Sequence, residues 1–311
     1  MKKHNFSAGP CILPASVLKQ ASNAVINFDN LDLSLLEISH RSGNFVSVME
    51  HAKELALEHL GLQNKGYKAL FLQGGASMEF LMVAYNFLEN KAGYTNTGTW
   101  SDKAIKEAKL FGNVNVLASS KESNYTSIPK DYEVPTDATY IHMTSNNTVF
   151  GTQHHSFPET NVPIVCDMSS DIFSRPIDVS KFGLIYCGAQ KNMGPAGVTL
   201  IIVNKDLLGK SGRPIPTMLD YNTHITKRSM FNTPPTFPIF VSMLTMRWVK
   251  ENGGVAAMAL KNEAKAKLLY NEIDANPMFE GTTHIEDRSL MNVTFKMKNT
   301  EKETAFLEAC A

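Results

Sequence analysis

The chain has 311 residues, 43% of them hydrophobic, so it can bury a large core in one big domain or in a big and a small one. Lysine plus arginine and aspartate plus glutamate number 30 each, and this formal charge of zero argues against nucleic acid or an anionic membrane as the main partner. We expect no secretory leader and no membrane span, because no apolar run has the required length. The cysteines lack metal-like spacing and predict reduced residues of a cytoplasmic protein: Cys11, Cys166, Cys187 and Cys310.

Apolar residues recur at helical spacing in some stretches and form short runs in others, which is typical of an α/β protein. Helices are expected over 14–28 and 45–60, from the turn at 73–77 to 88, from the segment 97–101 to 111, and over 238–249, 255–274 and 300–311. Strands are expected at 67–72, 91–96, 114–117, 139–144, 162–166, 184–187, 198–203 and 290–295. The buried-looking strands predict a mainly parallel sheet covered by helices.

Two of these strands end in polar groups that suggest a cofactor. Asp167 follows one strand and Lys191 follows the next, in a loop that continues into the turn 194–197. Alone, an aspartate there is usually a loop cap and a lysine a surface residue. Together they suggest pyridoxal phosphate (PLP), because a lysine amine can form a Schiff base with the aldehyde and a carboxylate can keep the ring nitrogen protonated.

The segment SSDIFSRPIDVSKFGLIYCGAQKNMGPAG resembles the lysine-bearing segment of phosphoserine aminotransferases, which are fold-type-I PLP enzymes. The resemblance extends from HNFSAGPCILP near the start to EDRSLMNVTF near the end. It implies an N-terminal arm at 1–15, a large α/β/α PLP-binding domain at 16–253 and a small α/β domain at 254–311. The implied reaction moves an amino group between O-phosphoserine and 2-oxoglutarate in serine biosynthesis, and extends to a phosphorylated hydroxythreonine on the pyridoxine route.

The resemblance also assigns roles to individual residues. It makes Lys191 the Schiff-base residue and general base, and Asp167 the partner of the ring nitrogen. It implies a homodimer with shared sites, in which two residues of one chain reach the cofactor phosphate of the other. The remaining implied contacts are Ala76, Ser77 and Gln190 to the phosphate, Trp100 stacked on the ring, Thr148 near the ring hydroxyl, Arg41 on the substrate acid, and Asn232 and Thr233 from the partner chain.

From the residues alone, the strand, the two glycines and the helix start around Ser77 predict an anion site, although such turns are common. Adjacent His154 and His155 do not predict a metal site, because neighbouring histidines cannot readily share one ion.

The family's C-terminal arginine motif has no match in this sequence, so we expect an apparently incomplete small domain and weaker substrate binding. Family members also often carry an acidic residue where Asn147 stands. Two alternatives therefore stay open: a PLP-binding protein with little turnover, and another fold-type-I PLP enzyme such as a desulfurase or a serine–glyoxylate aminotransferase.

Overall fold

A seven-stranded sheet forms the centre of the computed structural model, which describes residues 4–310; residues 1–3 of the expected arm and Ala311 of the last expected helix lie outside it. The strand order is β1-β7-β6-β5-β4-β2-β3. β7 runs antiparallel to both its neighbours and the other pairs are parallel, so the mainly parallel sheet is confirmed. The strands are β1 (Tyr67–Leu72), β2 (Lys91–Asn96), β3 (Asn113–Ser119), β4 (Ile141–Thr144), β5 (Ile164–Asp167), β6 (Phe182–Gly188) and β7 (Thr199–Asn204).

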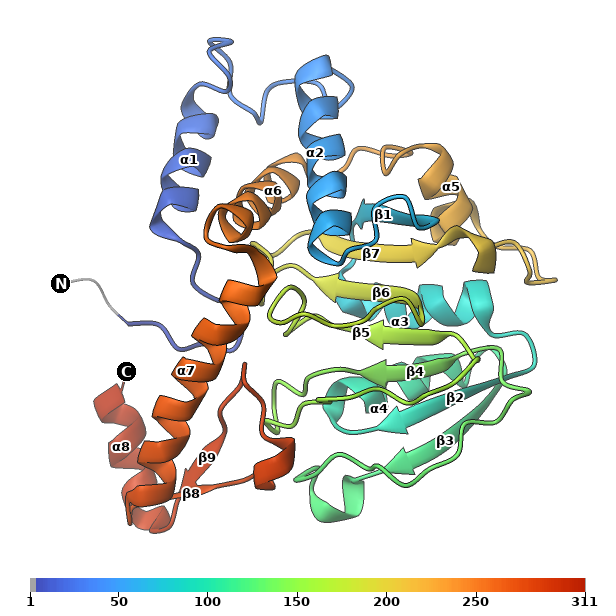
Figure 1. Cartoon of the computed structure of the whole chain (residues 1–311). Coiled ribbons are helices and arrows are strands. Elements are labelled where there is room, and N and C mark those ends of the chain that lie inside the picture. The colour runs from blue at the N-terminus through green and yellow to red at the C-terminus, as the bar shows by residue number, and fades with distance from the viewer. Residues whose placement is uncertain (1–3, 311) are drawn as a thin grey trace.

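Helices cover both faces of the sheet (Figure 1). One face packs on α1 (Ala15–Ile26), α2 (Gly43–His59) and α6 (Thr236–Glu251), and the other on α3 (Gly75–Phe87), α4 (Thr99–Ala108) and α5 (Tyr221–Thr226). Successive side chains of a strand point to opposite faces of the sheet, so each strand contributes residues to both cores in alternation. In β6, Ile185 and Cys187 enter the first core, whereas Leu184 and Tyr186 enter the second.

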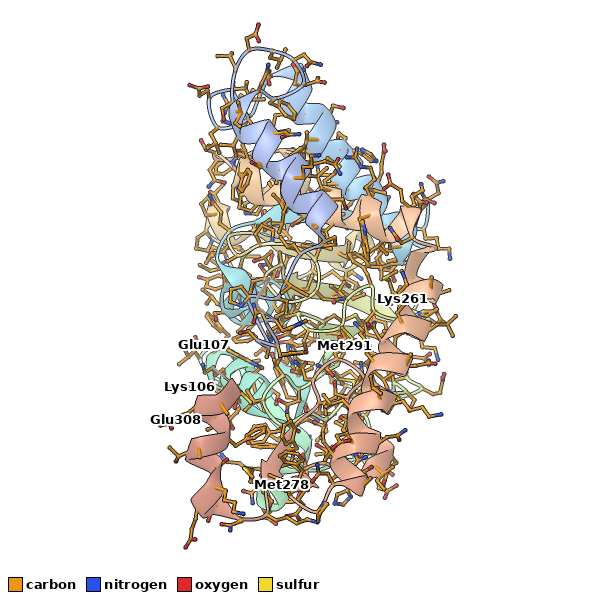
Figure 2. All side chains as sticks on the ribbon, turned by 90° about the vertical axis from the view of Figure 1, so that its left-hand side faces the viewer. Lys106, Glu107, Lys261, Met278, Met291 and Glu308 are labelled. Carbon is orange, nitrogen blue, oxygen red and sulfur yellow. The ribbon has the colours of Figure 1, made fainter. Side chains whose placement is uncertain are left out.

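The C-terminal part is a smaller unit beside the edge of the sheet. It consists of α7 (Gly254–Ala275), a ribbon of β8 (Phe279–Gly281) and β9 (Phe295–Met297), and α8 (Glu303–Cys310). Figure 2 places this unit at one end of the molecule and α1 with α2 at the other. Between residues 4 and 310, no helix combines the length and apolar character needed to cross a membrane.

The strand expected at 290–295 is wrong. The hydroxyl of Ser289 accepts hydrogen bonds from the amides of Met291 (2.9 Å) and Asn292 (2.8 Å), so the chain turns there and pairs as a strand only from Phe295 onward. Such local side-chain bonds compete with sheet formation. The sequence pattern also missed two short elements, β8 and α5.

A buried carboxylate in α3 makes the stability of the fold depend on pH. Glu79 is fully buried; its Oε2 accepts a hydrogen bond from the hydroxyl of Tyr221 (2.5 Å), and its Oε1 has no partner among the described residues. Burial raises the pKa of Glu79 to about 7, although the hydrogen bond from Tyr221 partly opposes this shift. The folded chain therefore binds this proton more tightly than the unfolded chain does.

We expect Glu79→Gln to remove this dependence. In the wild type, the stability linked to protonated Glu79 is fully present below the unfolded pKa, near 4.5, and is lost as pH rises through about 7. The free energy of unfolding of the wild type should fall relative to that of the variant by about 3 kcal/mol between pH 4.5 and 8. Chemical denaturation at several pH values measures this difference, with the exposed Glu89→Gln as control. A constant difference between wild type and Glu79→Gln across this range would contradict the expectation.

Candidate active site

The ends of four strands meet at one edge of the sheet. Thr199, the first residue of β7, pairs with Leu72 at the end of β1 and with Gly188 at the end of β6. Asp167, the last residue of β5, pairs with Tyr186 near the end of β6. The loops after β1, β5 and β6 therefore start from one edge of the sheet. β7 lies between β1 and β6, so the ends of these two strands are two strand spacings, or about 10 Å, apart. Ligands of α/β sheets bind at such carboxyl edges.

Lys191 lies in the turn after β6, and its side chain points along this edge. Its Nζ donates a hydrogen bond to the hydroxyl of Thr148 (2.6 Å) and lies 5.1 Å from the ring centroid of Trp100. Burial lowers the pKa of the Lys191 amine, and the charge of Asp167 opposes this shift. The structure thus brings together four of the predicted site residues and lowers the pKa of the lysine amine relative to that of an exposed lysine.

Asp167 is held by a residue that sequence reasoning missed. One carboxylate oxygen, Oδ1, accepts hydrogen bonds from the backbone N–H (2.9 Å) and the hydroxyl (2.6 Å) of Ser169. The same hydroxyl accepts a hydrogen bond from the N–H of Gly188 (3.1 Å), which ties β5 to the start of the lysine loop. Burial raises the pKa of Asp167, and the charge of Lys191 opposes this. The spacing Asp-x-Ser is that of an Asx-turn and could have identified Ser169.

Trp100 is positioned through a close contact between two loops. Gly98 precedes α4 with no room for a side chain, because an added Cβ would overlap the amide of Asn147. That amide, buried at 2% exposure, donates a hydrogen bond to the carbonyl of Thr97. Asn147 therefore fixes the loop that precedes α4, the helix that carries Trp100. The indole Nε1 of Trp100 is buried and has no partner within residues 4–310.

The N-terminus of α3 forms the second part of the site. Gly74 and Gly75 adopt positive φ angles of 105° and 68°, which turn the chain from β1 into the helix. Ala76 is half-buried and Ser77 exposed in the first turn, where free N–H groups and the helix dipole favour an anion. Gln190 is half-buried beside Lys191 in the neighbouring loop.

Asn232 and Thr233 lie next to this helix start within the same chain. The amide of Asn232 donates to Oε1 of Gln73 (2.9 Å), and Nε2 of Gln73 donates to the carbonyl of Thr233 (3.1 Å). Arg41 is exposed in the segment 27–42, which connects α1 to α2 at the end of the molecule away from the sheet (Figure 1). Among the described residues, the side chain of Arg41 makes no hydrogen bond or ion pair with Lys191.

The N-terminal arm is part of the site, which sequence reasoning missed. Gly9 has a φ of 155°, and a Cβ added to it would lie 3.0 Å from Cγ of Lys191. The N–H of Cys11 donates to the carbonyl of Gln190 (2.9 Å), so the arm lies against the lysine loop. Burial raises the pKa of the Cys11 thiol, and the charge of Lys191 opposes this. A glycine at this contact is explained by the close approach of the arm to the lysine.

Comparison with known proteins first defines the class. The family model described as aminotransferase class-V matches residues 3–310. A phosphoserine aminotransferase of Flavobacterium johnsoniae is 61% identical over 308 residues, covering 98% of this chain and 86% of that protein. The chain therefore belongs to the phosphoserine aminotransferases of class V.

Solved structures agree with this assignment. The phosphoserine aminotransferase of Bacillus circulans subsp. alkalophilus has a TM-score of 0.96 and 43% identity, covering 99% of this chain and 87% of that one. The PLP-bound phosphoserine aminotransferase of Trichomonas vaginalis has a TM-score of 0.94 and 34% identity, covering 99% of this chain and 89% of that one. The expected fold type is thereby confirmed.

Proposed function

We propose that the protein transfers an amino group between O-phospho-L-serine and 2-oxoglutarate, giving 3-phosphohydroxypyruvate and L-glutamate, with PLP held by Lys191. The observation that carries this is the pair of half-buried Lys191 and buried Asp167, which follow adjacent strands. The related phosphorylated hydroxythreonine is a second substrate under this proposal, and the expected cytoplasmic location belongs to it as well.

The residues at the edge fit PLP. Of the two carboxylate oxygens of Asp167, Oδ1 takes both bonds from Ser169, and no donor among the described residues is bonded to Oδ2. Oδ2 can therefore accept a hydrogen bond from a protonated ring nitrogen. The indole of Trp100 offers a flat face beside Lys191, and the first turn of α3 offers N–H groups and the hydroxyl of Ser77 to a phosphate.

Each residue has a distinct task in this reaction. When bound, PLP supplies an electrophilic aldehyde and an electron-accepting ring. Lys191 would hold PLP through Nζ and, once released by a substrate amine, would remove the proton from the substrate Cα. Asp167 stabilises the positive charge on the ring nitrogen, and Trp100 fixes the plane of the ring and excludes water from one face. Thr148 holds the amine of Lys191 in place before the cofactor enters.

The site is completed by a second chain in this proposal. In this proposal Asn232 and Thr233 contact the phosphate bound by the partner; within their own chain both are bonded to Gln73, just before the start of α3. Arg41 is exposed in the connection between α1 and α2, and in this proposal its guanidinium binds a substrate acid in the partner's site. A homodimer with shared sites is consistent with both placements.

The reaction is tested by incubating the purified protein with PLP, L-glutamate and 3-phosphohydroxypyruvate and measuring the O-phosphoserine formed. A parallel reaction with L-cysteine as sole substrate, and with dithiothreitol to release bound sulfur as sulfide, measures desulfuration. The proposal predicts O-phosphoserine and no sulfide; Cys166 and Cys187 are fully buried, and burial raises the pKa of both thiols. Sulfide without O-phosphoserine would replace the proposal with the desulfurase alternative.

A further inference from the structure

A second buried aspartate, with no role in the chemistry above, lies four residues beyond Asp167. Asp171 is completely buried in the turn after β5. Its Oδ1 accepts a hydrogen bond from the hydroxyl of Ser145, its Oδ2 accepts one from Nε2 of Gln153 (3.1 Å), and Nη2 of Arg175 lies 3.7 Å from Oδ2. A carboxylate at such depth is costly unless it is fully partnered, and these three groups partner it.

The first connection of Asp171 leads to the cofactor-binding carboxylate. The backbone N–H of Ser145 donates to the carbonyl oxygen of Asp167 (3.0 Å), and the Ser145 hydroxyl lies 3.1 Å from the same oxygen. The turn of Asp171 is also bonded to the residue after the lysine, because the amide of Asn192 donates to the carbonyl of Ile172. Asp171 is therefore linked to the backbone of Asp167 and, through its turn, to the residue that follows Lys191.

The second connection leads to the C-terminal part of the chain. The amide of Gln153 is shared: Nε2 donates to Asp171, and Oε1 accepts from the backbone N–H of Leu290 (3.0 Å). The N–H of Gln153 also donates to the carbonyl of Asp287 (2.9 Å). A charged carboxylate accepts hydrogen bonds and donates none, so Asp171 orients the amide of Gln153 with its NH₂ group toward Oδ2. The amide oxygen of Gln153 then faces the segment 287–292.

A neighbouring contact strengthens the same junction. The amide of Asn146, the residue after Ser145, donates to Oδ1 of Asn292 (2.8 Å) and to the hydroxyl of Ser170 (2.8 Å). Figure 2, which looks onto the edge where the parallel strands end, shows Met291 of this segment in front of the sheet. The segment 287–292 thus forms one wall beside the proposed active site.

We propose that Asp171 is a positioning residue for the amino transfer: through Ser145 and Gln153 it holds the backbone of Asp167 and the segment 287–292 in one fixed arrangement. It acts through these neighbours and contacts neither cofactor nor substrate. The catalytic part of this inference rests on the proposed function, whereas the coupling between Asp171 and the segment 287–292 does not.

The test is Asp171→Asn, which keeps the shape of the side chain and removes its charge. In cofactor-free protein, the amides of Ser289 and Leu290 should exchange with deuterium about tenfold faster or more, as expected when a hydrogen bond to a charged group is lost. The amides of β7 should keep their exchange rates. In the loaded enzyme, kcat should fall about tenfold with both KM values within about twofold, and the visible circular dichroism of the bound cofactor should change.

Asp178→Asn is the matched control, because Asp178 lies exposed in the same connection between β5 and β6. If Asp171→Asn does not fold, Gln153→Leu removes the amide that links Asp171 to Leu290, leaves the bond between Asp171 and Ser145 in place, and should accelerate the same amides. Exchange that rises equally in β7 and in 287–292, or that matches the Asp178→Asn control, would overturn the inference. Absence of transamination by the wild type would instead count against the proposed function, since the exchange measurement needs neither cofactor nor substrate.

Discussion

Replacing Lys191 with alanine should reduce amino transfer by about 10⁴-fold or more, because one side chain supplies both the covalent attachment and the general base. Lys191 is half-buried, its amine is bonded to the hydroxyl of Thr148 and lies 5.1 Å from the Trp100 ring, and no other described amine occupies its place. The rate of O-phosphoserine formation measures the loss. Borohydride reduction followed by mass spectrometry should find cofactor on the Lys191 peptide of the wild type only.

Two further measurements separate a chemical role of Lys191 from a structural one. Lys210→Ala changes an exposed lysine and should leave the rate unchanged. A small amine such as methylamine should restore part of the activity of Lys191→Ala, since it can replace the missing base. Wild-type activity in Lys191→Ala would remove the basis of the proposed mechanism.

Asp167→Asn should lower kcat by about 10²–10³-fold, the range seen when one preorganised electrostatic group is removed from an active site. Asparagine can still accept the bonds from Ser169, so the loops should keep their places. It carries no negative charge to hold a proton on a ring nitrogen. Steady-state rates with glutamate measure the loss, and the borohydride test should still find cofactor on Lys191.

The same variant has a consequence for the lysine. Burial lowers the pKa of Lys191 and the charge of Asp167 raises it, so removing that charge should lower the pKa further. The rate at which an acylating reagent modifies Lys191 in cofactor-free protein should therefore reach its plateau at a lower pH in Asp167→Asn than in the wild type. An unchanged pH profile, or unchanged kcat, would show that Asp167 does not interact with the site as described.

Part of this site follows from local sequence patterns. Asp167 and Lys191 come directly after short buried runs, and the carboxyl ends of neighbouring parallel strands share an edge, so their proximity was predictable. The turn of Gly74 and Gly75 into a helix likewise indicates an anion site from residue type alone. These features depend on residues close together in the chain.

Other parts depend on contacts that no local pattern contains. The arm at Gly9 approaches Lys191 across 182 residues of chain, and the amide of Asn147 meets Gly98 in a different loop. The alternation in 290–295 is typical of a strand, but the hydroxyl of Ser289 binds the following amides and turns the chain. The sequence around Arg41 resembles a substrate-binding loop, but only the fold shows that the segment 27–42 lies at the end of the molecule away from the sheet.

The proposed function requires that Lys191 holds PLP and that the protein exchanges an amino group with glutamate. An absorption spectrum of the purified protein with PLP, recorded before and after addition of L-glutamate, measures both. We expect a visible band from cofactor attached to Lys191, which glutamate replaces with the ultraviolet band of the amino form of the cofactor. A visible band that glutamate leaves unchanged, or no band after addition of PLP, would rule out the proposed function.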